Sequence, residues 1–325
     1  MKPIFSPDRR IYAIALLFIG CSFLMACKKE REVIIPTETP EKTWKLPQGD
    51  HPFDQRIQSY YDRFGTFLLY KFTDQDVYWN IGTNTQNYRT VPADETYIPQ
   101  QLDLLDQIFF INYQDSTLRK YLPIKMFLCS SLRVGTTKPE VNAFLMGTNE
   151  TGTITGIAMG GYQSFAVNWG RKAVLTIKTP IDSVTIFKND VNYSFLKMGN
   201  ITGKMGKSAD FLTSSDYTTV LPATPAVPTA GTPVVERYKR GFIGVGTTIP
   251  TPNTDWYAYL RAITSTPYTD LTNNTTPITD ATYKGMLNGL KDPNGLIKKK
   301  YNLMINFYKT QYNIDLQAIG NWRAN

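Results

Sequence analysis

The feature that most constrains what this chain can fold into is an apolar segment near its start, residues 11–23. It follows two arginines and ends at Leu24-Met25-Ala26-Cys27. A basic start, an apolar stretch and a small residue before cysteine predict a secretory signal of the lipoprotein kind, with Cys27 as the lipidated residue. A rival cleavage site before Cys21 has Phe18 where the motif has leucine, so we prefer Cys27. Residues 1–26 are therefore expected to take no part in the fold.

Lipidation of Cys27 predicts the membrane as a partner. The apolar segment is shorter than the about 20 residues that a transmembrane helix needs. Acyl chains bury in a bilayer with about 0.8 kcal/mol per methylene, so several chains on one cysteine give a stable anchor. With Cys21 removed and Cys27 acylated, only Cys129 is left. No intrachain disulfide is then possible, and Cys129 is predicted to be a small buried hydrophobe.

The composition excludes several classes of function. The chain has 325 residues, 42% of them hydrophobic, which is enough for a large core. The net charge of +8 is scattered except at Lys298-Lys299-Lys300, where we expect a solvated helix face and no nucleic-acid partner. The chain contains one histidine, His51. One histidine cannot form a multi-histidine zinc site. Because His51 is expected to lie in a tether before the fold, we also expect no His-Cys pair and no Ser-His-Asp triad.

The domain organisation follows from proline content and periodicity. Residues 27–53 contain four prolines among charged and threonine residues, which predicts an extended tether with His51 inside it. Residues 54–325 form the expected domain, with possible lobes at about 54–179 and 180–325. Apolar spacing predicts helices over 57–64, 99–113, 181–201, 280–290 and 296–312, strands over 66–72 and 124–128, and a β-meander from 142–146, 154–159 and 164–168.

Several short patches occur in an order that is familiar as a set. They are Val91-Pro92-Ala93, Tyr121-Leu122-Pro123-Ile124-Lys125, Ala209-Asp210-Phe211, Arg240-Gly241-Phe242-Ile243 and Tyr312-Asn313-Ile314-Asp315-Leu316. From about Ile57 onward, this order resembles the zinc-metallopeptidase lipoproteins of the Bacteroidota, also described as substrate-import-associated zinc metallohydrolases. The resemblance implies an α+β, zincin-like fold with a small mixed β-sheet, packed helices and a helical C-terminal portion. The charged cluster after Cys27 resembles the export signal of surface lipoproteins in the same bacteria.

The resembling family carries a His-Glu-x-x-His motif on the helix before the Asp-Phe patch, where two histidines grip zinc and the glutamate activates water. Counting back from Asp210-Phe211 places Phe195, Leu196 and Gly199 at the motif positions, or Met198, Gly199 and Thr202 in a shifted register. Neither register supplies a ligand. We therefore expect a catalytically degenerate member without zinc or another cofactor. Only Asp255 keeps a carboxylate in the segment that matches the family's downstream acidic stretch.

The resemblance also implies a location and partners. Its members are lipoproteins of the outer membrane, exposed at the cell surface beside a TonB-dependent transporter and its lipoprotein lid. This implies an accessory or binding role in the capture of a glycan or peptide, with Asp255, Trp256 and Tyr257 as ligand-binding candidates in the former zinc cleft. The alternatives are a hydrolase, peptidase or glycosidase, with an atypical carboxylate site, and a structural partner of the importer. Asp115-Ser116-Thr117 and Asp182-Ser183-Val184 resemble the O-glycosylation motif of these bacteria.

Overall fold

The computed structural model describes residues 44–73, 76–77, 88–134, 143–145, 164–177, 182–222, 234–244 and 248–323. The chain divides into two units, 1–45 and 46–325, and almost all described residues belong to the second. The predicted signal and Cys27 lie outside the described residues. No helix of the described residues is long and apolar enough to span a membrane.

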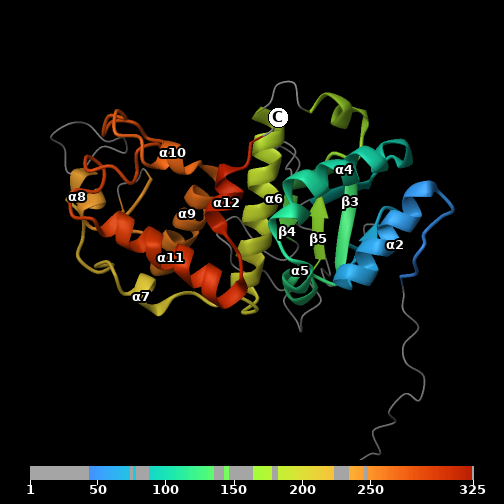
Figure 1. The fold of residues 1–325 in the computed structure, drawn as a ribbon, viewed down its shortest axis with the longest axis horizontal. Coiled ribbons are helices and arrows are strands. Elements are labelled where there is room, and N and C mark those ends of the chain that lie inside the picture. The colour runs from blue at the N-terminus through green and yellow to red at the C-terminus, as the bar shows by residue number, and fades with distance from the viewer. Residues whose placement is uncertain are drawn as a thin grey trace, which may run out of the picture. The chain divides into compact units, whose positions relative to one another are not determined.

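The first half of the second unit combines helices with a small sheet (Figure 1). Its elements are α2 (Pro52–Phe64), β1 (Phe67–Leu69), β2 (Tyr88–Pro92), η1 (Glu95–Tyr97), α4 (Ile98–Ile108), η2 (Phe110–Asn112), α5 (Asp115–Tyr121), β3 (Lys125–Val134), β4 (Ala143–Leu145), β5 (Ser164–Val167) and η3 (Lys172–Thr176). The second half is helical, as predicted. It comprises α6 (Asp182–Ile201), α7 (Ala209–Leu212), α8 (Val234–Lys239), α9 (Pro252–Ser265), α10 (Tyr268–Leu271), α11 (Leu296–Tyr312) and α12 (Leu316–Asn321). The fold class is α+β, which confirms the expectation.

The sheet has strand order β1-β3-β5-β4, and β2 pairs with β3. β3 is parallel to both β1 and β5, whereas β4 and β5 are antiparallel. β5 pairs with β3 on one edge and directly with β4 on the other, so no strand lies between β4 and β5, and the predicted β-meander is wrong in its strand order. Its middle segment, 154–159, lies outside the described residues. All described residues of β1 and β5 are buried, as is usual for parallel strands covered on both faces.

The folded unit begins earlier than we expected. Leu46 packs against the core, and Gln48 Oε1 accepts hydrogen bonds from the backbone of Tyr70 and Lys71. His51 is the N-cap of α2, where its backbone N–H donates to Asp54 Oδ2, and its ring forms an ion pair with Glu95 when protonated. Residues 46–53 therefore belong to the folded unit, and the tether boundary at residue 53 is wrong.

Two helix predictions have opposite outcomes. The helix predicted over 296–312 is α11, with the predicted bounds. The helix predicted over 280–290 is wrong, because this segment forms successive turns. Gly285 has φ +69°, and Lys291 Nζ donates to the backbone carbonyls of Asp280, Thr282 and Lys284 at 2.7, 3.0 and 2.8 Å. The side chain of Lys291 thus satisfies carbonyl groups that a helix would have used internally.

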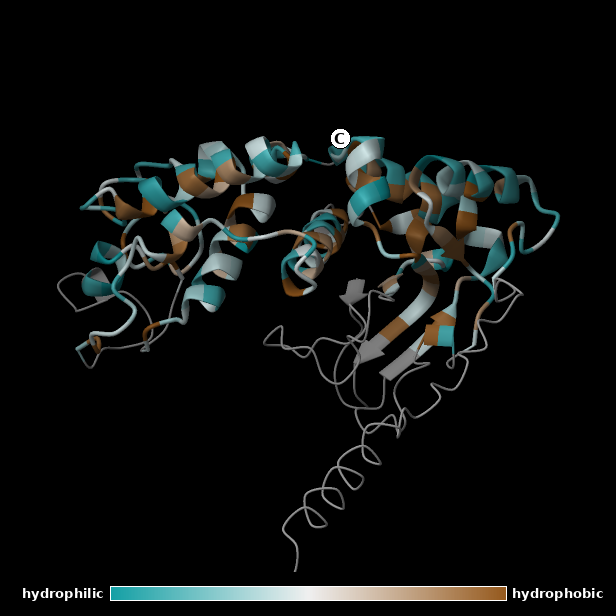
Figure 2. Cartoon of the chain, turned by 90° about the horizontal axis from the view of Figure 1, so that it is seen from below, coloured by the Kyte–Doolittle hydropathy of each residue, from teal (hydrophilic) through white to brown (hydrophobic). Residues whose placement is uncertain are grey.

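One continuous hydrophobic core joins the sheet to the C-terminal helices through α6. On the sheet side, Asn192 of α6 donates to the Ile108 carbonyl and accepts from the Tyr113 hydroxyl. On the other side, Lys188 of α6 donates to the carbonyls at the ends of α9 and α12. The helices carry alternating polar and apolar bands, as amphipathic helices do (Figure 2). Cys129 is free and fully buried in β3, which confirms its prediction.

Candidate functional site

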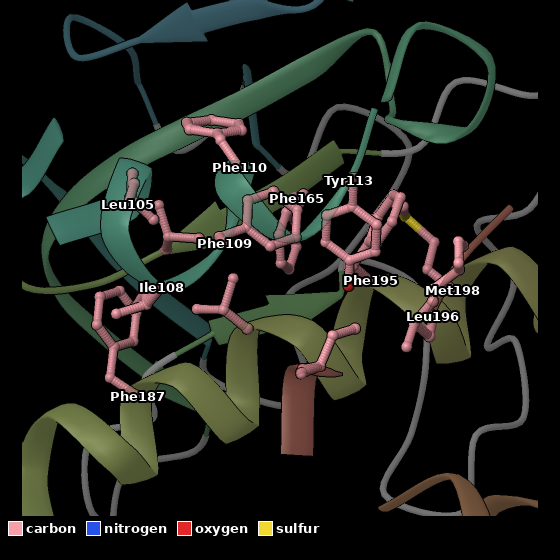
Figure 3. Close-up of a cluster of buried hydrophobic side chains, with 14 of the residues drawn as sticks. Leu105, Ile108, Phe109, Phe110, Tyr113, Phe165, Phe187, Phe195, Leu196 and Met198 are labelled. Carbon is pink, nitrogen blue, oxygen red and sulfur yellow. The ribbon is translucent and has the colours of Figure 1, made fainter. Parts of the chain in front are cut away.

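The motif positions of α6 face the hydrophobic core. Phe195 and Leu196 are fully buried, and Met198 is 4% exposed. The ring of Phe195 makes edge contacts with Phe109 and Tyr113, with centroids 5.4 and 5.0 Å apart (Figure 3). Phe195 thus fills space between α6 and the sheet side of the molecule. None of Phe195, Leu196 and Met198 carries a nitrogen, oxygen or thiolate donor for a metal.

Gly199 is common to both registers and has no room for a larger side chain. A Cβ atom at this position would lie 2.6 Å from Met205 Sδ and 2.7 Å from Met205 Cγ. The Met205 backbone N–H also donates to the Gly199 carbonyl at 2.7 Å, which fixes this turn against the helix. Thr202, the last position of the shifted register, uses its hydroxyl to donate to the same carbonyl. The residues at these positions therefore do not fit a zinc ion.

Trp256 belongs to the core and is not an exposed ring. It is 0% exposed, and its indole Nε1 donates to Asn200 Oδ1 at 2.8 Å. Its ring meets Phe211 edge-on at 5.0 Å and stacks on Tyr308 at 6.0 Å. The expectation that Trp256 presents a face to a ligand is wrong. Trp256 thus links α9 to the rings of α7 and α11 by aromatic contacts and to α6 by a hydrogen bond.

Asp255 pairs with Lys300, and both are fully enclosed. The ammonium of Lys300 forms an ion pair with Asp255 Oδ2 and donates to Ser215 Oγ at 3.1 Å and to the Gly241 carbonyl at 3.0 Å. The Tyr217 hydroxyl donates to the same carboxylate oxygen at 2.7 Å. Four rings surround the ammonium, with centroids 4.7 to 5.6 Å away, namely Phe211, Tyr217, Phe242 and Tyr259.

This pair corrects the prediction for Lys298-Lys299-Lys300. Lys298 and Lys299 are exposed, as expected, but Lys300 is 0% exposed. Burial raises the pKa of Asp255 and lowers the pKa of Lys300, and the attraction between the two charges opposes both shifts. An enclosed pair of this kind links α9 to α11 and offers no open position to a ligand.

The partly exposed face of α6 and α9 carries a different arrangement, which we call the cation–tyrosine row: Arg261, Tyr193, Lys197, Tyr257 and Lys207. The Arg261 guanidinium lies 5.0 Å from the Tyr193 ring, and Lys197 lies 5.7 Å from the same ring. Lys197 and Lys207 lie 5.4 and 4.8 Å from the ring of Tyr257. Cations and rings thus alternate along this face, and all five side chains are partly exposed.

The electrostatics of the row favour an anion. Burial lowers the pKa of Lys197 and of Lys207 and raises the pKa of Tyr193 and of Tyr257 to about 12, so both hydroxyls stay protonated at neutral pH. Asp190 neutralises Arg261 through a 2.6 Å ion pair. Lys207 donates to the neutral amide of Asn253 at 2.8 Å. Within the described ranges, neither Lys197 nor Lys207 forms an ion pair with a carboxylate.

Of the three ligand-binding candidates from the sequence, only Tyr257 lies on this face. Tyr193, Lys197, Lys207 and Arg261 were missed. A signal was present, because Tyr193 and Lys197 are four residues apart, as are Tyr257 and Arg261, and this spacing places two residues on one helix face. The pairing of α6 with α9, which brings the two sets together, has no counterpart in local sequence.

Among the described residues, no three His, Cys, Asp or Glu side chains are grouped so that they could hold a metal ion.

Comparison with known proteins gives one structural similarity. No protein-family model matches the sequence, and no curated protein sequence matches it. A solved structure from Bacteroides caccae, described as a "putative zinc-binding metallo-peptidase", matches over 82% of this chain and 88% of that chain. The sequence identity is 14% and the TM-score is 0.49.

Proposed function

We propose that this chain is a lipoprotein of the outer-membrane surface that binds a nutrient, a glycan or a peptide, as an accessory of an import system and without zinc catalysis. The anchoring part of the proposal is supported by the motif that ends at Cys27. The import part, with a TonB-dependent transporter and its lipoprotein lid as partners, rests on the resemblance of the sequence patches to surface lipoproteins of the Bacteroidota.

The observation that carries the non-catalytic part is the burial of the motif positions in α6. Phe195 and Leu196 have no exposed surface, and a Cβ on Gly199 would collide with Met205. A zinc peptidase needs two imidazoles one helical turn apart and a glutamate that reaches the metal-bound water. Restoring that motif would place three polar or larger groups inside a packed core, which is strongly unfavourable.

The side chains of the cation–tyrosine row support a binding role. The cation–tyrosine row presents two lysines without a carboxylate partner in the described part of the chain, beside tyrosine hydroxyls that donate and accept hydrogen bonds. Such a face has groups for recognition but no pair of nucleophile and base.

A binding and turnover screen on the same sample tests this proposal. The full chain is purified from membranes in detergent and presented to an array of glycans and peptides, and each ligand that binds is then incubated with the protein and analysed for products. We expect at least one ligand to bind and to be recovered intact. Cleavage of a bound ligand would contradict the proposal in favour of a hydrolase with an atypical site, and a folded protein that binds nothing would favour a structural partner.

A further inference from the structure

We propose that the cation–tyrosine row is a binding site for acidic glycans, and that Lys197 and Lys207 neutralise the carboxylate or sulfate groups of the sugar. This inference rests on the proposed binding function and specifies its site and its ligand class. The five residues of the row come from α6, α9 and the loop that follows α6 (Figure 1).

The tyrosine rings hold the cations in place. Lys197 lies over two rings, Tyr193 at 5.7 Å and Tyr257 at 5.4 Å, and Lys207 lies over Tyr257 at 4.8 Å. Attraction between an ammonium and a ring face restricts a lysine that would otherwise sample many rotamers. Part of the entropic cost of binding an anion is thereby met before the ligand arrives.

The charges of the row are not balanced within the described residues. Arg261 has Asp190 as its carboxylate partner, whereas Lys207 has only the amide of Asn253. Partial burial makes the charged form of both lysines less favourable, which is why the pKa of each is lowered. An anion placed between Lys197 and Lys207 would relieve this cost, and its attraction to them would be stronger than in open water.

The surroundings of the row favour a sugar over a peptide. Of the large exposed apolar side chains among the described residues, one, Ile186, belongs to α6, and none belongs to α9 or to the loop that carries Lys207. A peptide ligand usually needs apolar pockets for its side chains. A row of ammonium groups and tyrosine hydroxyls instead suits a chain that is rich in hydroxyl groups and carries a regular negative charge.

Titration with defined oligosaccharides tests the proposal on the full chain. The probes are an oligogalacturonate, a chondroitin sulfate oligosaccharide and a neutral cello-oligosaccharide of matched length, together with a poly-glutamate peptide. Affinity is measured by calorimetry at low and at high salt. We expect an acidic oligosaccharide to bind, with an affinity that falls as salt rises, because the site is partly exposed. The carboxylated and sulfated probes distinguish the two sources of negative charge.

Matched variants locate the site. K197Q together with K207Q should weaken binding of the acidic oligosaccharide by about tenfold or more, because two charge-assisted contacts are lost. The control, K298Q together with K299Q, removes the same charge from exposed positions of α11 and should change affinity by less than about twofold. Tyr257→Leu removes the ring over which both lysines lie and should weaken binding, whereas Tyr257→Phe keeps the ring, loses only the hydroxyl and should weaken binding less. Melting temperatures of all variants verify that they are folded.

Three results would overturn the assignment. One is unchanged affinity of the K197Q and K207Q double variant for the acidic oligosaccharide. Another is binding of the neutral oligosaccharide alone, which would leave the proposed binding function intact and remove only this site and ligand class. A third is binding of poly-glutamate without binding of either acidic oligosaccharide, which would assign the row to an acidic peptide.

Discussion

Replacing Lys300 by methionine removes the cation from the buried pair and keeps an unbranched side chain at this position. Four aromatic side chains surround the position, namely Phe211, Tyr217, Phe242 and Tyr259. Asp255 is then left at 1% exposure with the Tyr217 hydroxyl as its remaining hydrogen-bond donor among the contacts described above. Removal of one partner from a buried ion pair costs about 3–5 kcal/mol, because a charge stays buried without compensation.

The loss of unfolding free energy caused by Lys300→Met has an upper limit. The stranded carboxyl group can escape by taking up a proton, and holding a carboxyl of unperturbed pKa about 3.9 in its protonated form at pH 7 costs about 4 kcal/mol. At pH 5 the same protonation costs only about 1.5 kcal/mol. The destabilisation by Lys300→Met should therefore be about 3–4 kcal/mol at pH 7 and about 1.5 kcal/mol at pH 5.

The sign follows from proton binding. In the variant the pKa of Asp255 is higher in the folded state than in the unfolded state, so the folded state binds the extra proton. Stability relative to the wild type is therefore greatest below the unfolded pKa and is lost as the pH rises toward the folded pKa. Urea unfolding at pH 5, 6 and 7, followed by fluorescence, measures this difference.

Lys298→Met and Lys299→Met are matched controls, because the same substitution then falls on exposed neighbours in α11. Each should change the free energy of unfolding by less than about 0.5 kcal/mol. A Lys300→Met protein that is as stable at pH 7 as these controls would refute the enclosed pair. So would a destabilisation that does not shrink at pH 5.

Three further predictions concern single residues. Burial, with added repulsion from Arg323 and Arg261, lowers the pKa of Lys188 to about 7, so above that pH the unfolded state binds one more proton than the folded state. The free energy of unfolding of the wild type should therefore rise by up to about 1.4 kcal/mol per pH unit between pH 7 and 10. Urea unfolding of Lys188→Met should lack this rise, and parallel pH profiles of the two proteins would contradict the lowered pKa. Trp256→Ala should cost about 3–5 kcal/mol in the same unfolding assay, because the ring is fully buried, and a loss below about 1 kcal/mol would place it outside the core. Cys27→Ala should abolish acyl labelling and release the protein from the membrane fraction, whereas persistent labelling would move the lipidation site to Cys21.

Local periodicity carries much of the fold. The helix over 296–312 and the helix that begins near residue 181 follow from apolar spacing, and Gly65 ends α2 in the left-handed conformation that favours glycine. The strand order could not be predicted in this way, because β5 inserts between β3 and β4 through contacts that no local pattern encodes. The turns over 280–290 were missed for a similar reason, since the side chain of Lys291 takes the place of helical hydrogen bonds.

The candidate site shows the same division between local and tertiary information. Tyr257 was identified from its position beside the acidic segment, but its neighbours Lys197 and Lys207 come from α6 and from the loop that follows it, and they become visible only in the packed structure. In the run Lys298-Lys299-Lys300, three identical residues differ only in which helix face they occupy. The third is buried because Asp255, 45 residues earlier in the chain, lies opposite it. The sequence predicted that all three lysines are exposed to solvent, but tertiary packing buries Lys300.

Zinc content tests the proposal that this chain works without zinc, which rests on the buried positions of α6. The full chain, purified without chelators and dialysed against metal-free buffer, is analysed for zinc by mass spectrometry, and its melting temperature is recorded with and without EDTA. Because Phe195, Leu196 and Gly199 offer no donor and no space, we predict well under one zinc per chain and an unchanged melting temperature. One zinc per chain, with a melting temperature that falls on chelation, would show that the protein holds a zinc site and would contradict the proposal.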